Sequence, residues 1–162
     1  MIAIKQILLP VDFSEPALEA TRYALELAER FSATLHLLHV IEDPAVYLPM
    51  FESYPLPSRE EFNQYAQTRL ENWIPESDAQ KCAIERHWVH GTPFVEILKF
   101  ARTQNVDLIV VGTHGAGMIR HLLLGSVAEK VVRKASCPVL TVRPDGHQFV
   151  HPVDADETDA AT

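Results

Sequence analysis

The chain is poor in cysteine and in long hydrophobic runs. Its two cysteines, Cys82 and Cys137, are far apart in the sequence, and neither has a second cysteine at metal-ligand spacing. This usage argues against a disulfide framework and against a cysteine-based zinc site, so we expect two buried, reduced thiols. No apolar run approaches the ~18–20 residues that a membrane span needs, so no membrane-spanning segment is expected.

Positive charge is also scarce, and the formal net charge of the 162 residues is −8 at pH 7. Phosphate contacts to nucleic acid need a basic surface, so this balance argues against general nucleic-acid binding. Residues 145–162 are acidic, and we expect them to form a disordered tail after a single domain of residues 1–144. The first residues lack the zones of a signal peptide, so the expected location is the cytoplasm.

Short apolar runs alternate with helix-start signals along the domain. The runs predict strands over 6–11, 33–41, 82–89, 106–112 and 137–142. Helices are expected to begin near Ser14, Ser58, Thr92 and Ser126, each beside a proline or an acid that favours a helix start. This alternation predicts an α/β fold: a doubly wound, five-stranded parallel sheet with helices on both faces. We take the strand order to be 3-2-1-4-5.

Glycine is scarce but concentrated. Four of the six glycines lie in "GTHGAGMIRHLLLGS", residues 112–126, between a predicted strand and a predicted helix. The pair Ser126 and Glu129 has capping-box spacing, so the helix is expected to be capped by Ser126. A helix N-terminus attracts anions, and Gly125 would let a phosphate approach its amides, as Gly112 and Gly115 would at the strand end. The stretch therefore predicts a backbone cradle for a triphosphate.

A carboxylate is expected beside this cradle. Asp12 follows the first strand, and the assumed order makes that strand a neighbour of the fourth. Ligands of doubly wound sheets bind at the carboxyl ends of such neighbours, where the connections diverge to opposite faces. Asp12 and the glycine stretch should thus share one crevice, unless Asp12 serves only at the helix start.

The glycine spacing resembles a known motif. Gly112, Gly115, Gly125 and Ser126 match G-x2-G-x9-G-(S/T), the nucleotide motif of the universal stress protein family in its ATP-binding branch. The opening "ILLPVDFSEPALEA" and the ending "LLLGSVAEKVVRKASCPVLTVRP" are similar to the same family, so the resemblance covers about residues 4–144.

The resemblance implies ATP as the ligand, bound rather than efficiently turned over. The nucleotide-binding residues that it implies are Pro10 and Asp12 toward the adenosine, Val40 toward adenine, Val111, Gly112 and Gly115 along the ribose and first phosphates, and Gly125, Ser126 and Val127 at the outer phosphates. Any Mg²⁺ would be held mainly by phosphate oxygens and water. The family also implies a homodimer through the last strand, and Pro138 to Val142, as an edge strand, would invite that pairing.

Several alternatives stay open. The leading function is a nucleotide-dependent stress-response regulator; the others are a slow ATPase and a dimeric interaction protein that binds no nucleotide. Efficient hydrolysis is not expected, because the sequence has no Walker-type lysine and no identifiable base near Ser126. Arg120 and His114 could contact phosphate or lie on the surface, and the role of residues 42–57 is undecided. Packing roles are favoured over metal binding for four further histidines: His36, His39, His87 and His90.

Overall fold

The computed structural model describes residues 2–42, 57–113 and 124–143. The strands are β1 (Gln6–Pro10), β2 (Thr34–Ile41), β3 (Ala83–His90), β4 (Leu108–Gly112) and β5 (Val139–Val142). The helices are α1 (Glu15–Phe31), α2 (Arg59–Glu71), α3 (Glu76–Ala79), α4 (Pro93–Thr103) and α5 (Ser126–Lys134). All five predicted strands are present with small shifts of their ends, whereas the one-turn helix α3 was not predicted.

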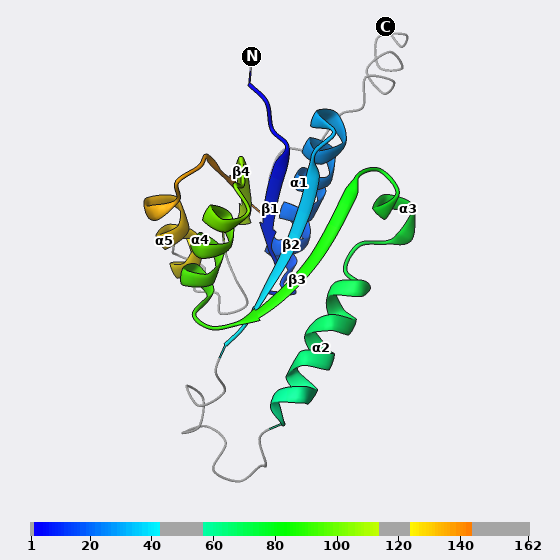
Figure 1. Ribbon diagram of the computed structural model, residues 1–162, viewed down its shortest axis with the longest axis vertical. Coiled ribbons are helices and arrows are strands. Elements are labelled where there is room, and N and C mark those ends of the chain that lie inside the picture. Colours follow the sequence, from blue (N-terminus) through cyan, green and yellow to red (C-terminus); the bar gives the residue numbers. More distant parts are fainter. Residues whose placement is uncertain (1, 43–56, 114–123, 144–162) are drawn as a thin grey trace, which may run out of the picture.

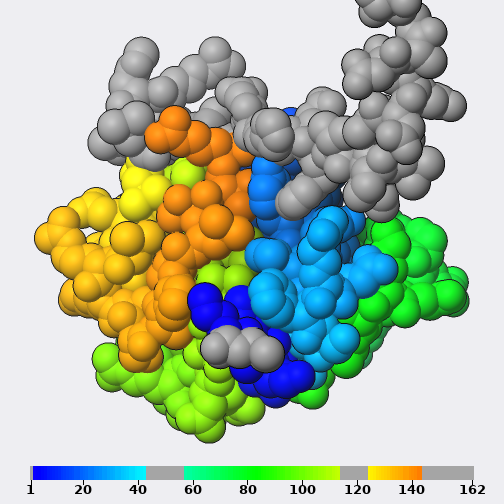
Figure 2. Space-filling model, turned by 90° about the horizontal axis from the view of Figure 1, so that it is seen from above, coloured from blue at the N-terminus to red at the C-terminus, as the bar shows by residue number. Residues whose placement is uncertain are grey.

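The strands form one parallel sheet in the order β3-β2-β1-β4-β5, which confirms the expected topology. Every strand starts at the end of the molecule where the chain begins, at the top of Figure 1. Figure 2 views this amino end, with the dark blue residues that follow Met1 between light blue and orange segments of the chain. The carboxyl ends of the strands therefore gather at the opposite end of the molecule.

Side chains of the inner strands alternate between two hydrophobic cores, one on each face of the sheet. Ile7 and Leu9 of β1 enter the core formed with α1 and α2, whereas Leu8 enters the core formed with α4 and α5. Alanines of α1 (Ala20, Ala24 and Ala28) are fully buried, so this helix lies close to the sheet. The helices cover both faces, as the apolar runs predicted.

Three of the four helix starts lie where the sequence predicted them and one does not. Thr92 is the N-cap of α4, although its side chain makes no capping bond. Ser14 caps α1 by accepting a bond from the Ala17 amide, and Ser58 and Glu61 form the predicted capping box at α2. At α5, however, the N-cap is Gly125, and Ser126 is already the first helical residue. The prediction that Ser126 caps this helix is therefore wrong. The bond from the Gly125 amide to the Thr113 carbonyl places Gly125 at the N-cap position instead.

The two cysteines are free, as expected, but only partly buried. Burial raises the pKa of both thiols. Among the described residues, no helix is long and apolar enough to cross a membrane. Residues 145–162 lie outside the described residues.

Candidate functional site

The ends of β1 and β4 separate at the carboxyl end of the sheet. β1 pairs with β2 along its whole length, but it pairs with β4 at Ile7↔Leu108 and Leu8↔Ile109, near the start of both strands. The Asp107 amide bonds to the Gln6 carbonyl, so even-numbered residues of β1 direct their backbone groups toward β4. Pro10 is one of them and has no N–H to donate. The proline thus stops the β1–β4 ladder where a ligand site is expected.

Asp12 lies directly beyond β1 and is exposed. Its Oδ1 accepts a bond from the Ser14 amide at 3.1 Å and another from the Ser14 hydroxyl. This local turn presents the carboxylate beside the first turn of α1. Asp12 therefore does support the helix start, and its exposure leaves it accessible from solvent.

Phe13 adopts a left-handed backbone conformation with φ of +64°. A bulky residue is uncommon there, and tertiary contacts hold it in place. Its ring lies 4.5 Å from the His39 ring and 5.6 Å from the Trp73 ring, and the Arg69 guanidinium lies 4.8 Å above it. These contacts fix the turn that carries Asp12, and no sequence motif predicted them.

His39 joins this turn to β2. Its Nδ1 donates to the Val11 carbonyl at 2.7 Å, and burial lowers the pKa of the imidazole. The ring is therefore neutral at neutral pH, with the proton on Nδ1. His39 has a positioning role here, in agreement with the packing role that the sequence favoured.

Val40 lies on the part of β2 that extends past β1. The last β1 partner on β2 is Leu38, whereas Val40 pairs with Val89 of β3. The Leu38 carbonyl accepts the Val11 amide on the β1 side, and residues two apart on a strand direct their backbone groups to the same side. The Val40 amide and carbonyl therefore point past the end of β1, where the resemblance implies adenine.

Gly112 ends β4 and packs against the start of α1. A Cβ on Gly112 would lie 2.7 Å from the backbone carbonyl oxygen of Pro16, closer than Cβ atoms come to non-bonded neighbours in proteins. The start of α1 therefore fills the space on the side-chain side of Gly112, and the contact of its backbone with a phosphate stays a prediction. Val111 is buried beside it and pairs with Thr141 of β5.

The start of α5 is fixed to the end of β4. The Gly125 amide donates to the Thr113 carbonyl, while the Thr113 amide donates to Val142 of β5 at 2.8 Å. Gly125 has no side chain to cap α5, so the first-turn amides receive no side-chain cap from it. Ser126 is exposed and Val127 packs into the α4/α5 core, which leaves its amide as the group available to a ligand.

We call this set of residues the strand-end site: Pro10, Asp12, Val40, Val111, Gly112, Gly125, Ser126 and Val127. The fold brings these eight predicted residues to the carboxyl end of one sheet, on β1, β2, β4 and α5. The ninth, Gly115, lies outside the described residues, as do His114, Arg120 and most of residues 42–57.

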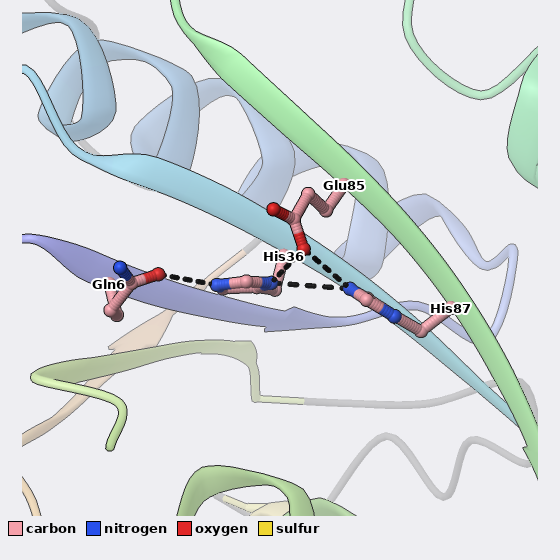
Figure 3. A network of polar contacts seen from close by, with 4 residues as sticks. All are labelled: Gln6, His36, Glu85 and His87. Carbon is pink, nitrogen blue, oxygen red and sulfur yellow. Dashed lines mark hydrogen bonds and ion pairs between the residues drawn. The ribbon is translucent and has the colours of Figure 1, made fainter. Parts of the chain in front are cut away.

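Two histidines meet between β2 and β3, before the carboxyl ends of these strands. His36 Nδ1 lies 3.2 Å from His87 Nε2, and Glu85 Oε2 lies within 3.5 Å of both (Figure 3). The sequence favoured packing roles for these histidines and did not include Glu85. The alternation of Glu85 and His87 was visible in the sequence, but only the register of β2 against β3 could show that His36 joins them.

Comparison with known proteins agrees with the fold and with the family that the sequence resembles. Residues 3–143 match the profile of the universal stress protein family. The chain is 36% identical over 140 residues to universal stress protein MJ0531 of Methanocaldococcus jannaschii, covering 86% of this chain and 82% of that protein. The solved structure of MJ0577 from the same organism matches with a TM-score of 0.70 and 33% identity over 88% of this chain and 97% of that one.

A third match is a solved structure of a universal stress protein in complex with cAMP. It is 25% identical to this chain and has a TM-score of 0.59. The match covers 89% of this chain and 100% of that one. The profile match covers residues 3–143, a range that includes every strand of the sheet and the strand-end site. The chain belongs to the universal stress protein family.

Proposed function

We propose that this protein binds ATP at the strand-end site and acts as a nucleotide-dependent regulator. The observation that carries the proposal is the start of α5, whose N-cap Gly125 supplies no side-chain cap, bonded to the end of β4 beyond the point where β4 pairs with β1. The helix supplies amides and a partial positive charge for phosphates. At the other side of the site, Val40 directs backbone groups toward the region expected to hold adenine.

The charge of the site supports recognition through the backbone. The segments 10–12, 111–113 and 125–127 contain no lysine or arginine. An anionic ligand there would depend on amides and the α5 dipole, and Mg²⁺ on the phosphate oxygens would offset its charge. The complex of a family member with cAMP supports an adenine nucleotide as the ligand class.

Binding without efficient hydrolysis is part of the proposal. Rapid phosphoryl transfer requires a positioned water and charge stabilisation on the leaving oxygens. Asp12 is the one carboxylate of the three segments, and its Oδ1 is engaged with Ser14. Slow turnover is the alternative, and phosphate release from the ATP-loaded protein separates the two.

The test begins with the nucleotide that the purified full chain carries. Denaturing the protein should release ATP in equimolar amount, measured by chromatography of the supernatant. The stripped protein should rebind ATP, and Gly125→Leu should lose this binding because the added side chain covers the first-turn amides. The Gly125 backbone, with φ of −67° and ψ of 154°, is open to leucine, so the variant should fold.

The matched control is Ser58→Ala, which removes the cap of α2 and leaves α5 intact. It should bind ATP as the wild type does. An empty wild-type protein that ignores added ATP would refute nucleotide binding and favour the interaction protein. Equal binding by wild type and Gly125→Leu would refute the proposed phosphate position.

Pairing through β5 is the proposed assembly. β5 lies at the edge of the sheet, next to β4, and Thr141 on it is exposed. An edge strand has backbone groups available for a second strand, so two copies could join at Pro138 to Val142 about a twofold axis. Sedimentation at micromolar concentration should give a dimer, and a monomer would contradict this arrangement.

A further inference from the structure

Three side chains converge on the face of the sheet that α4 covers, near the amino ends of β2 and β3. His36 is the register partner of Glu85, and His87 lies two residues farther along β3. Paired residues of parallel strands and residues two apart project from the same face. Register therefore places all three on one face, and Figure 3 shows their polar atoms directed toward one point.

The distances between these atoms match those of metal ligands. His36 Nδ1 and His87 Nε2 are 3.2 Å apart, and Glu85 Oε2 lies 3.4 Å from the first and 3.5 Å from the second. Two ligands bound tetrahedrally at 2.0–2.1 Å from one ion would be about 3.3–3.4 Å apart. The nearly equilateral triangle thus has the size of one face of a zinc coordination tetrahedron.

A neighbouring amide orients the first ligand. His36 Nε2 lies 2.6 Å from Gln6 Oε1, so the imidazole donates its proton to the amide oxygen and Nδ1 carries the lone pair. Gln6 is itself held, because its backbone amide donates to Asp107 Oδ2 at 2.9 Å. Outer contacts of this kind fix the tautomer and ring orientation of metal-binding histidines.

The surroundings keep both histidines neutral and leave one side open. Burial lowers the pKa of His36 and of His87, so both rings are neutral at neutral pH. A neutral His87 offers its Nε2 lone pair to a metal when its proton is on Nδ1. The Phe100 ring packs 5.6 Å from His36 and 4.8 Å from His87, which restricts both imidazoles. His36 is 4% exposed, whereas the Glu85 side chain is 57% exposed, so an ion could enter at the sheet edge.

We propose that His36, Glu85 and His87 bind one divalent transition-metal ion of the zinc class. Two imidazoles and a carboxylate suit zinc or its neighbours better than magnesium or calcium, which prefer oxygen ligands. The three protein ligands leave a fourth position for water or an external group. The site differs from the strand-end site in the groups that it uses, because its ligands are side chains, whereas Val40 offers backbone groups. His87 is the register partner of Leu38, which precedes Val40 by two residues, or about 7 Å of strand.

The test uses the full chain after removal of metal with a chelator. Calorimetric titration with zinc chloride should give a 1:1 site, and Co²⁺ should give the visible spectrum of a tetrahedral ion. Glu85→Gln and His87→Gln should each weaken binding by about tenfold or more and abolish that spectrum. Both side chains are at least partly exposed, so neither substitution removes a core residue.

The matched control is His90→Gln on the same strand, because His90 projects from the opposite face to Glu85 and His87 and its ring lies 2.7 Å from Asn63 Oδ1 of α2. It should bind zinc as the wild type does. Circular dichroism in chelator should confirm that every variant is folded. Absence of zinc binding, or binding that Glu85→Gln and His87→Gln leave unchanged, would overturn the proposal and assign the triad to a hydrogen-bond network only.

Discussion

The two ends of the sheet present polar groups in different ways. At the carboxyl end, the strand-end site depends on backbone amides and carbonyls, which Pro10 and Gly125 leave available. At the amino end, the polar atoms of His36, Glu85 and His87 are side-chain atoms from two strands. A backbone site requires glycine and proline at set positions of one connection, whereas a side-chain site requires correct register between strands that are distant in sequence.

The largest effect is expected from adding a side chain where β4 meets α1. Gly112→Val should lower the free energy of unfolding by about 1–3 kcal/mol, because its Cβ would overlap the Pro16 carbonyl. Urea unfolding measures the change. Gly125→Leu is the comparison and should cost about 1 kcal/mol or less, since its backbone conformation suits leucine. Similar losses for the two variants would contradict the distinction between a packing glycine and a ligand-facing glycine.

A smaller effect should separate two helix starts. Ser58→Ala should destabilise the protein by about 1 kcal/mol, because it removes the capping box of α2. Ser126→Ala should change stability by less than about 0.5 kcal/mol, because Gly125 and not Ser126 occupies the N-cap of α5. Urea unfolding of both variants checks this. A loss of stability in Ser126→Ala as large as that in Ser58→Ala would support Ser126 as the cap of α5.

Acid should destabilise both ends of the sheet. Burial lowers the pKa of His36 and His87 at the amino end and of His39 at the carboxyl end below their ordinary value of 6.5. Below about pH 6.5 the unfolded chain therefore binds more protons than the folded one, so stability falls as the pH falls. Unfolding measured from pH 7.5 to 5.5 in chelator should show this decline.

Substitution of single histidines measures how much each group of histidines contributes to the loss of stability in acid. His87→Gln should flatten the pH dependence by removing a titrating group from the triad, and His39→Gln should do so at the other end. Glu85 faces His36 and His87 and partly opposes their lowered pKa. A variant that carries both substitutions should show the smallest dependence of unfolding free energy on pH. The same dependence as in the wild type would contradict the assignment of the acid effect to these histidines.

The smallest effect is expected when a substitution in one site is tested for its influence on ligand binding at the other site. Glu85→Gln should change the free energy of ATP binding by less than about 0.5 kcal/mol, and Gly125→Leu should leave zinc affinity equally unaffected, because distant sites without shared partners act additively. Calorimetry of each ligand with each variant gives the comparison. A larger change in either direction would show that the two ends are coupled through β2.

Much of the fold could be predicted from local patterns. Short apolar runs with helix signals between them located the five strands, and the glycine spacing identified the connection after β4. The capping box of Ser58 and Glu61 was also predictable, because both of its hydrogen bonds lie within one helix turn. The strand order rested on the general behaviour of doubly wound sheets, and it is confirmed.

Other features required contacts between distant segments. Capping-box spacing at Ser126 failed because the bond from Gly125 to Thr113 sets where α5 begins. The left-handed conformation of Phe13 depends on His39, Trp73 and Arg69, which belong to other elements. Such contacts leave no periodic signal in the sequence around Phe13.

The alternation of strands and helices follows from local sequence alone, because periodicity and capping are local properties of the chain. Local sequence also leaves backbone groups available after β1 and β4, because Pro10 lacks an N–H and Gly125 lacks a side chain. The packing of Gly112 against α1 and the contacts of His36 with Glu85 and His87 arise only when the chain is folded. Close packing and strand register fix those contacts, and both depend on residues that are far apart in the sequence.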